Sequence, residues 1–205
     1  MPTGPSFSAD PGFYEVPQGR LATIVTSLEM LARPSIEDAP APTGMRLEEL
    51  TGIGAEDYRR LYARVGADWL WFSRLRMGDD ELLRIIRDSA VDIYGVAVDG
   101  DQFQGLLELD FRDPGTCEIA FFGLSGAALE RRLGGWLMRE TLRLAWSRPI
   151  VRLWVHTCTL DHPRALGFYR RFGFTPFKQQ IEIIDDPRLD GTLPRTAAPH
   201  IPLIA

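Results

Sequence analysis

The sequence predicts a mixed α/β fold: a mostly antiparallel central sheet that contains one parallel strand pair, with helices on both faces. Two observations predict it. Residues 91–98, 103–111 and 117–124 are apolar strand candidates joined by the turn signals VDGDQ and RDPGT, which indicates an antiparallel meander. A helix over residues 133–147 then joins the third strand to a fourth at 150–158, and a strand–helix–strand connection indicates a parallel pair.

The other elements follow from local patterns. Residues 21–31 (LATIVTSLEML) are rich in β-branched and apolar side chains and predict a strand added to the main sheet. Short strands are expected at 45–50 and 175–184. Helices are expected at 55–65, at 79–88 with Asp79 as N-cap, and at 163–172 with Pro163 in the first turn.

Proline and glycine divide the chain into three parts. The segment APAPTG closes an N-terminal extension, residues 1–44, which carries the added strand. The compact domain spans residues 45–185, and residues 186–205 read as an irregular C-terminal tail.

Composition excludes several classes of protein. The 205 residues are 45% hydrophobic and 25% charged, as in ordinary globular domains. No charge-free apolar run approaches the roughly 18 residues of a membrane span, and no secretory signal is visible, so we expect a cytoplasmic protein without a membrane partner. A net charge of −5 without a Lys/Arg cluster argues against nucleic acid, and two cysteines with three scattered histidines argue against a metal site.

The segment 117–138 places a strand before a helix that opens on Gly134 and Gly135. A helix start exposes unpaired N–H groups and the positive end of the helix dipole, so it suits a phosphate. Two glycines before a helix are also compatible with an ordinary turn.

The spacing Ala165, Tyr169, Gly173-Phe174 resembles the closing motif of the GNAT superfamily of N-acetyltransferases, and residues 117–138 resemble that superfamily's acetyl-CoA motif. The resemblance covers about residues 45–185. The stretch WVHTCTLDHP is similar to a group of bacterial members of unassigned substrate. The resemblance implies a GNAT-type fold and an enzyme that transfers an acetyl group from acetyl-CoA to a primary amine by direct attack in a ternary complex.

The resemblance also implies a cofactor site. A β-bulge at residues 122–124 would offer backbone groups to the thioester, and a pyrophosphate loop falls on residues 129–134. Leu129, Glu130 and Arg132 depart from the usual loop pattern, and Arg131 with Arg132 can pair with phosphate oxygens. The implied cofactor-binding residues are Phe122, Gly123, Leu124, Glu130, Arg131, Arg132, Leu133, Gly134, Gly135, Trp136 and His162.

Three residues are candidates for proton transfer. Tyr169 matches the tyrosine that protonates the leaving thiolate in relatives, or it is a core aromatic residue. Glu118 matches the glutamate base of the histone-acetyltransferase branch, or it is a solvated strand-end residue. His156 is the second base candidate, or a hydrogen-bonded core histidine.

Two further regions have open interpretations. His162 stands where relatives often carry a cofactor-contacting asparagine, and Asp161 or His162 can instead cap the helix that follows. In residues 58–77, aromatic side chains and arginines form either an acceptor pocket with an anion clamp or the packing face of a helix pair. The side chains concerned are Trp69, Trp71, Phe72, Arg74 and Arg76.

Two hypotheses are alternatives to the acetyltransferase hypothesis. One is a non-catalytic acyl-CoA-binding or interaction module with a degenerate phosphate loop. The other is a scaffold that oligomerises through residues 21–31. The acceptor, a small-molecule or peptide amine, is not specified by the sequence, and homodimer formation is left open.

Overall fold

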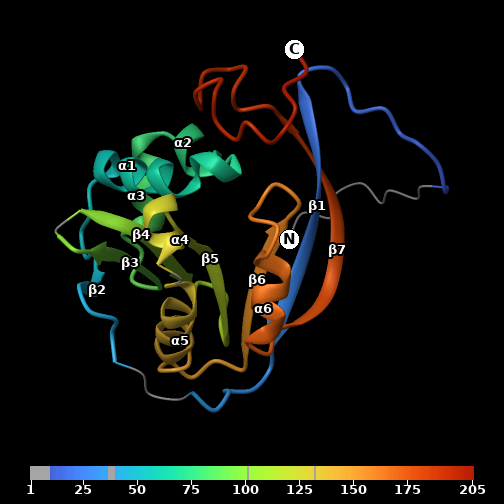
Figure 1. Ribbon diagram of the computed structural model, residues 1–205. Helices are drawn as coiled ribbons and strands as arrows, with labels where there is room; N and C mark the ends of the chain where they lie inside the picture. The colour runs from blue at the N-terminus through green and yellow to red at the C-terminus, as the bar shows by residue number, and fades with distance from the viewer. Residues whose placement is uncertain (1–9, 37–39, 101, 132) are drawn as a thin grey trace.

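The computed structural model describes residues 10–36, 40–100, 102–131 and 133–205, and within these ranges the strands form a seven-stranded sheet (Figure 1). The strand order is β2-β3-β4-β5-β6-β1-β7, and every neighbouring pair is antiparallel except β5 with β6. The predicted fold class is therefore confirmed. The strands are β1 (Arg20–Met30), β2 (Met45–Glu49), β3 (Val91–Val98), β4 (Phe103–Asp110), β5 (Thr116–Leu124), β6 (Arg152–Cys158) and β7 (Thr175–Asp185).

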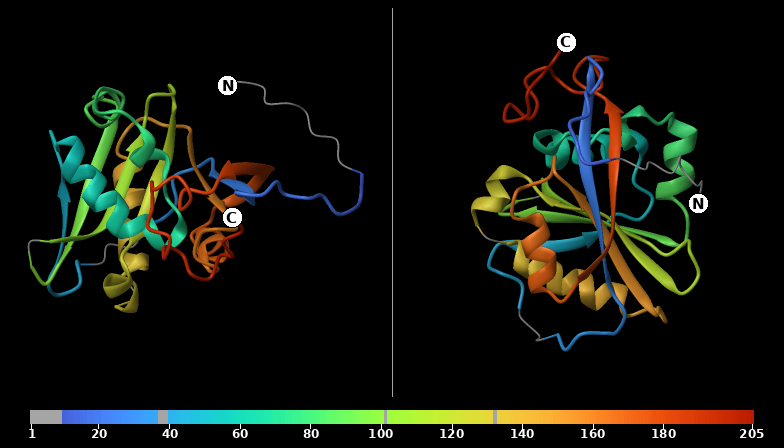
Figure 2. Two further views of the ribbon diagram at one scale, coloured as in Figure 1. Left: turned by 90° about the horizontal axis from the view of Figure 1, so that it is seen from above. Right: turned by 90° about the vertical axis from the view of Figure 1, so that its right-hand side faces the viewer.

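Helices cover both faces of the sheet, as Figures 1 and 2 show. Leu137 and Met138 of α5 belong to the apolar core on one face, and Leu61 of α1 and Leu82 of α3 to the core on the other. None of the described helices is long and apolar enough to cross a membrane. The helices are α1 (Ala55–Gly66), α2 (Ser73–Arg76), α3 (Asp79–Ile86), α4 (Gly126–Glu130), α5 (Gly134–Ala145) and α6 (Ala165–Arg171), and a 3-10 turn spans Ala67–Trp69.

The strand predicted at residues 21–31 is present as β1. It lies between β6 and β7 and is antiparallel to both, with Val25 opposite Cys158 on one side and Gln180 on the other. Both edges of β1 are therefore occupied within the chain, and β7 is the outer strand.

Two predicted helix starts are wrong in detail. The N-cap of α3 is Gly78, and Asp79 is the first helical residue, whose carboxylate pairs with Arg59 of α1 at 2.5 Å. An acidic residue in the first turn still interacts favourably with the positive end of the helix dipole. The helix predicted from Pro163 begins at Ala165, and Pro163 lies in the preceding turn.

The C-terminal tail lacks helix and strand but is packed against the domain. Arg188, which is 2% exposed, pairs with Asp186 at 2.7 Å and donates to the carbonyls of Ile201 and Pro202. These bonds fold the tail back on itself. A buried arginine supplies five donors, enough to satisfy several backbone carbonyls where strands and helices are absent.

A buried ion pair ties the helical layer to the sheet. Glu108 of β4 is fully buried, and its carboxylate accepts hydrogen bonds from Arg74 of α2 and from the phenol of Tyr58. Burial raises the pKa of Tyr58, and the neighbouring Glu108 carboxylate raises it further, so the phenol remains a donor. Removing one partner of such a pair leaves an uncompensated buried charge.

We therefore expect Arg74→Met to lower the free energy of unfolding by about 3 kcal/mol, because Glu108 then keeps only the Tyr58 hydrogen bond. The control is Arg143→Met, which removes an exposed pair with Glu140 and should change stability by less than about 1 kcal/mol. Urea unfolding measures both. Equal effects of the two substitutions would contradict the role given to Glu108.

Candidate active site

The parallel pair of the sheet comes apart after four residues. Pairing ends at Ile119 and Val155, whereas β5 continues to Leu124 and β6 to Cys158. Each strand stays paired on its outer side, β5 with β4 and β6 with β1. A cavity of about 1110 Å³ lies between the separated ends and is lined by residues of both strands.

A β-bulge accompanies this separation. The register between β4 and β5 shifts between Ile119 and Phe121, which leaves Ala120 as the extra residue. The bulge expected at residues 122–124 was therefore placed two residues too late. Because of the extra residue, Ile119 and Phe122 both face the α5 core although they are three apart.

Past the bulge, β5 presents free backbone donors to the slot. The N–H of Ser125 donates to the carbonyl of Gln104 at 2.7 Å, so it points toward β4. Along a strand, the N–H groups of successive residues point alternately to one side and to the other. The N–H groups of Phe122 and Leu124 therefore point to the opposite side, where β6 has moved away.

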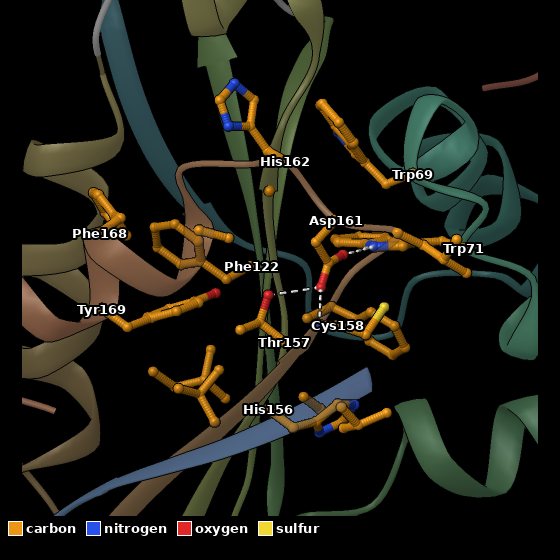
Figure 3. A pocket seen from close by; sticks show the side chains of 18 of the residues that line it. Trp69, Trp71, Phe122, His156, Thr157, Cys158, Asp161, His162, Phe168 and Tyr169 are labelled. Atoms are coloured by element: carbon orange, nitrogen blue, oxygen red, sulfur yellow. Dashed lines mark hydrogen bonds between the residues drawn. The ribbon is translucent and has the colours of Figure 1, made fainter. Parts of the chain in front are cut away.

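Trp71 packs against the β5 wall and reaches across to the other. A Cβ on Gly123 would lie 2.5 Å from Val65 Cγ1 and 2.9 Å from Trp71 Cη2, so only glycine allows this close approach to β5. The indole Nε1 of Trp71 donates to Asp161 Oδ1 at 3.4 Å (Figure 3). Trp71 thus connects the β5 wall to the loop after β6.

Asp161 organises that loop and was considered in the sequence only as a helix cap. Its Oδ2 accepts hydrogen bonds from Thr157 Oγ1 and from the N–H of Cys158, both at 2.8 Å (Figure 3). Neither Asp161 nor His162 caps α6, whose N-cap is Arg164; His162 Nδ1 accepts the N–H of Arg164 at 3.0 Å in the turn before the helix. One feature of the sequence could have indicated this role: Asp161 is an acidic residue three positions after the end of an apolar strand at Cys158.

The start of α5 forms the end of the slot nearest α6. Among the described residues, the first backbone bond of this helix runs from the N–H of Leu137 to the carbonyl of Leu133, and the N–H groups of Gly134 and Gly135 have no described helical acceptor. Gly134 and Gly135 line the cavity, whereas the side chains of Leu133 and Trp136 are buried in the core. Only backbone is therefore presented to a ligand here.

The expected pyrophosphate loop is partly helical, because α4 continues to Glu130. The Arg131 guanidinium pairs with the Asp99 carboxylate and donates to the carbonyl of Thr43 at 3.2 Å, so it is not directed at the cavity. Arg132 and the side chain of Glu130 lie outside what the structure describes.

Tyr169 of α6 lines the cavity, and its phenol is directed toward Thr157 (Figure 3). Its ring is buried and stands edge-on to Phe122 at 6.2 Å between centroids. Burial raises the pKa of Tyr169, with a smaller contribution from the Asp161 carboxylate. Tyr169 is therefore a core aromatic residue that also lines the slot.

Glu118 and His156 lie together on the other face of the sheet. His156 Nδ1 is 3.2 Å from Glu118 Oε1, and both residues line the cavity. The hydrogen bond to Glu118 raises the pKa of His156 against the opposing effect of desolvation. The two base candidates, weighed separately in the sequence, therefore form one hydrogen-bonded pair.

The segment that follows α1 forms one rim of the cavity. Trp69, Trp71, Phe72 and Arg74 line the cavity, so this segment both packs and borders the site. Arg76 is directed away, pairing with Asp190 of the tail at 2.6 Å.

The tail supports the same rim from outside. His200 contacts the ring of Trp69 at 5.7 Å between centroids, and Leu193 belongs to the apolar cluster of Leu70. No local pattern in the sequence indicates this contact.

Comparisons with known proteins agree with this geometry. A model of the acetyltransferase (GNAT) family matches residues 57–174. No curated protein matches the chain significantly. Among solved structures, a GCN5-related N-acetyltransferase from Sphaerobacter thermophilus aligns with 83% of this chain and 53% of its own at 14% identity and a TM-score of 0.58.

A GNAT-family protein from Novosphingobium aromaticivorans aligns with 84% of this chain and 69% of its own, at 15% identity and a TM-score of 0.55. An aminoglycoside acetyltransferase from an uncultured soil metagenomic sample aligns with 65% of this chain and 90% of its own, at 13% identity and a TM-score of 0.53. At these identities the similarity shows the fold.

This chain spans 63% and 51% of the lengths of two further matching proteins, from Staphylococcus epidermidis and Drosophila. The family model covers more than half of the chain and includes β5, α5, β6 and α6, the elements that form the slot. The chain therefore belongs to the GNAT family of acetyltransferases.

Proposed function

We propose that this protein is an acetyl-CoA-dependent N-acetyltransferase that acetylates a primary amine by direct attack in a ternary complex. The observation that carries the proposal is the slot between β5 and β6, which has free backbone donors on one wall and an uncapped helix start at its end. Such a slot accommodates an extended thioester arm and an anionic terminus at once.

The residues present fit this donor. A Cβ added to Gly135 would have Arg139 Nη1, at 4.0 Å, as its nearest neighbour, and one added to Gly134 would reach only van der Waals contact with Phe168. The space beside Gly135 is therefore open to a ligand, and Phe168 borders the space beside Gly134. Backbone N–H groups of α5 are the groups that would hold a pyrophosphate, and those of Phe122 and Leu124 would polarise the acyl carbonyl.

Acetyl-CoA, when bound, supplies the acetyl group as a thioester. An ammonium group has no lone pair, so the acceptor must first lose a proton. Glu118 accepts this proton in the proposal, directly or through a water, and His156 is the alternative acceptor. Because its pKa is raised, His156 stays protonated to higher pH, and the neutral imidazole that can accept a proton becomes more populated only as pH rises.

Tyr169 donates the proton that the departing thiolate needs. A phenol is protonated across the neutral range, which is the state a general acid requires, and burial raises the pKa of Tyr169 further. The acceptor is a small-molecule or peptide amine. The aminoglycoside acetyltransferase among the structural neighbours does not specify it, because 13% identity establishes the fold alone.

The first test is calorimetric titration with acetyl-CoA and with a dephosphorylated pantetheine analogue. We expect Gly135→Ala to weaken acetyl-CoA binding at least about tenfold and to leave binding of the analogue unchanged, because the added methyl group occupies space beside the α5 N–H groups. The control is Gly167→Ala in α6, where an added Cβ meets nothing within 4 Å and the residue does not line the cavity. Absence of acetyl-CoA binding to the unmodified protein would refute the proposal.

We expect Tyr169→Phe to lower kcat about 100-fold or more while leaving the Kd for acetyl-CoA unchanged, because only the proton donor is lost. CoA release with the best acceptor from an amine panel measures the rate. Tyr94→Phe is the control, since Tyr94 lies on β3 outside the cavity. Full activity of Tyr169→Phe would remove the residue from the mechanism. Acetyl-CoA binding without turnover of any amine would favour the non-catalytic acyl-CoA-binding module.

We expect the pKa of His156 to lie above its ordinary value near 6.5 and to fall in Glu118→Gln, because a neutral amide stabilises the imidazolium less than a carboxylate does. Histidine NMR titration measures it. His162 is the internal control: desolvation lowers its pKa, and the substitution should leave that value unchanged. A His156 pKa that is insensitive to Glu118→Gln would show that the pair does not exist in solution.

A further inference from the structure

One edge of the sheet is long and carries apolar side chains. β7 is paired with β1 along its inner side, and no described strand adjoins its outer side (Figure 1). Nearly all of its 11 residues are exposed. An open edge of this length presents a row of backbone donors and acceptors that a further strand can pair with.

The apolar side chains of this edge share one face. Ile24 of β1 lies opposite Ile181 of β7, and Ala22 lies opposite Ile183, so the alternation of the strands places all four on the same side. Ile24, Ile181 and Ile183 are 40%, 55% and 53% exposed.

The charges of β7 indicate what pairs with it. Lys178 and Glu182 lie on the opposite face from the isoleucines and form no ion pair within the described part of the chain. They are placed symmetrically, each two residues from Gln180. If two β7 strands run antiparallel about Gln180, each Lys178 lies opposite the Glu182 of the other copy.

This register is the favourable one. A shift of one residue in either direction puts Lys178 opposite Ile181 or Ile183, and reverses the faces of one strand relative to the other. In the symmetric register the two Ile181 side chains occupy diagonal positions on one face, while two opposite-charge pairs form on the other.

We propose that two copies of this chain associate through β7, antiparallel about a twofold axis at Gln180, so that one sheet continues through both molecules. The proposal does not depend on the acetyltransferase reaction. It has a consequence for the site, because Glu182 also lines the cavity near His156. The dimer places Lys178 of the second copy beside the rim of the first copy's site.

Sedimentation velocity of the full chain tests the proposal through a charge exchange. The unmodified chain is expected to be a dimer at micromolar concentration. Lys178→Glu creates two Glu–Glu contacts across the axis, and we expect it to raise the dimer dissociation constant at least tenfold. Adding Glu182→Lys to that variant restores both opposite-charge pairs in reverse and should restore the dimer.

The control is Arg20→Glu, which changes an exposed charge at the far end of β1, where Arg20 pairs with Asp185 of the same chain. It should leave the dimer intact. Circular dichroism verifies that each variant is folded. A monomeric unmodified chain overturns the proposal, as does a dimer that Lys178→Glu leaves unchanged, or a Lys178→Glu monomer that Glu182→Lys does not rescue.

Discussion

The separation of β5 from β6 is the constraint on which the rest of this structure depends. Two parallel strands that pair along their whole length leave no room between them, and here pairing stops at Ile119 and Val155. Each strand is held by a different neighbour, β4 for β5 and β1 for β6. The added strand β1 therefore has a role in the site: it satisfies the backbone of β6 on one side while the other side borders the slot.

Interactions on both sides hold the rim of the slot in place. From inside, Arg74 pairs with the buried Glu108, and its guanidinium lies 5.2 Å over the ring of Phe121, beside the bulge. From outside, His200 and Leu193 of the tail contact Trp69 and Leu70. A rim fixed in this way keeps the cavity formed without a ligand, which lowers the conformational cost of binding.

Local patterns were enough to predict the strands of the described sheet and the helices α1, α3, α5 and α6, because apolar periodicity and turn residues indicate strands and amphipathic helices. The short helices α2 and α4 were not predicted. The sheet order was not predictable in the same way. The place of β1 between β6 and β7 is set by contacts between segments more than 100 residues apart, which no local pattern encodes.

The same limit explains the corrections at the site. The bulge at Ala120 depends on the register of β5 against β4, so the position implied by the family resemblance was two residues late. Glu118 and His156 were found singly because only the parallel pairing of their strands brings them within 3.2 Å. The loop predicted at residues 129–134 is helical at its start, and Arg131 was predicted as a phosphate ligand although Asp99, from a distant turn, pairs with it.

The central claim is that the β5 wall of the slot and the start of α5 at its end bind one acyl-CoA ligand, and amide hydrogen exchange with and without acetyl-CoA tests it most directly. The account predicts slower exchange at saturating ligand in two separate segments, the end of β5 at Phe122 and Leu124 and the first turn of α5 at Gly134 and Gly135. Protection of only one of these two segments, or protection confined to other parts of the chain, would contradict it.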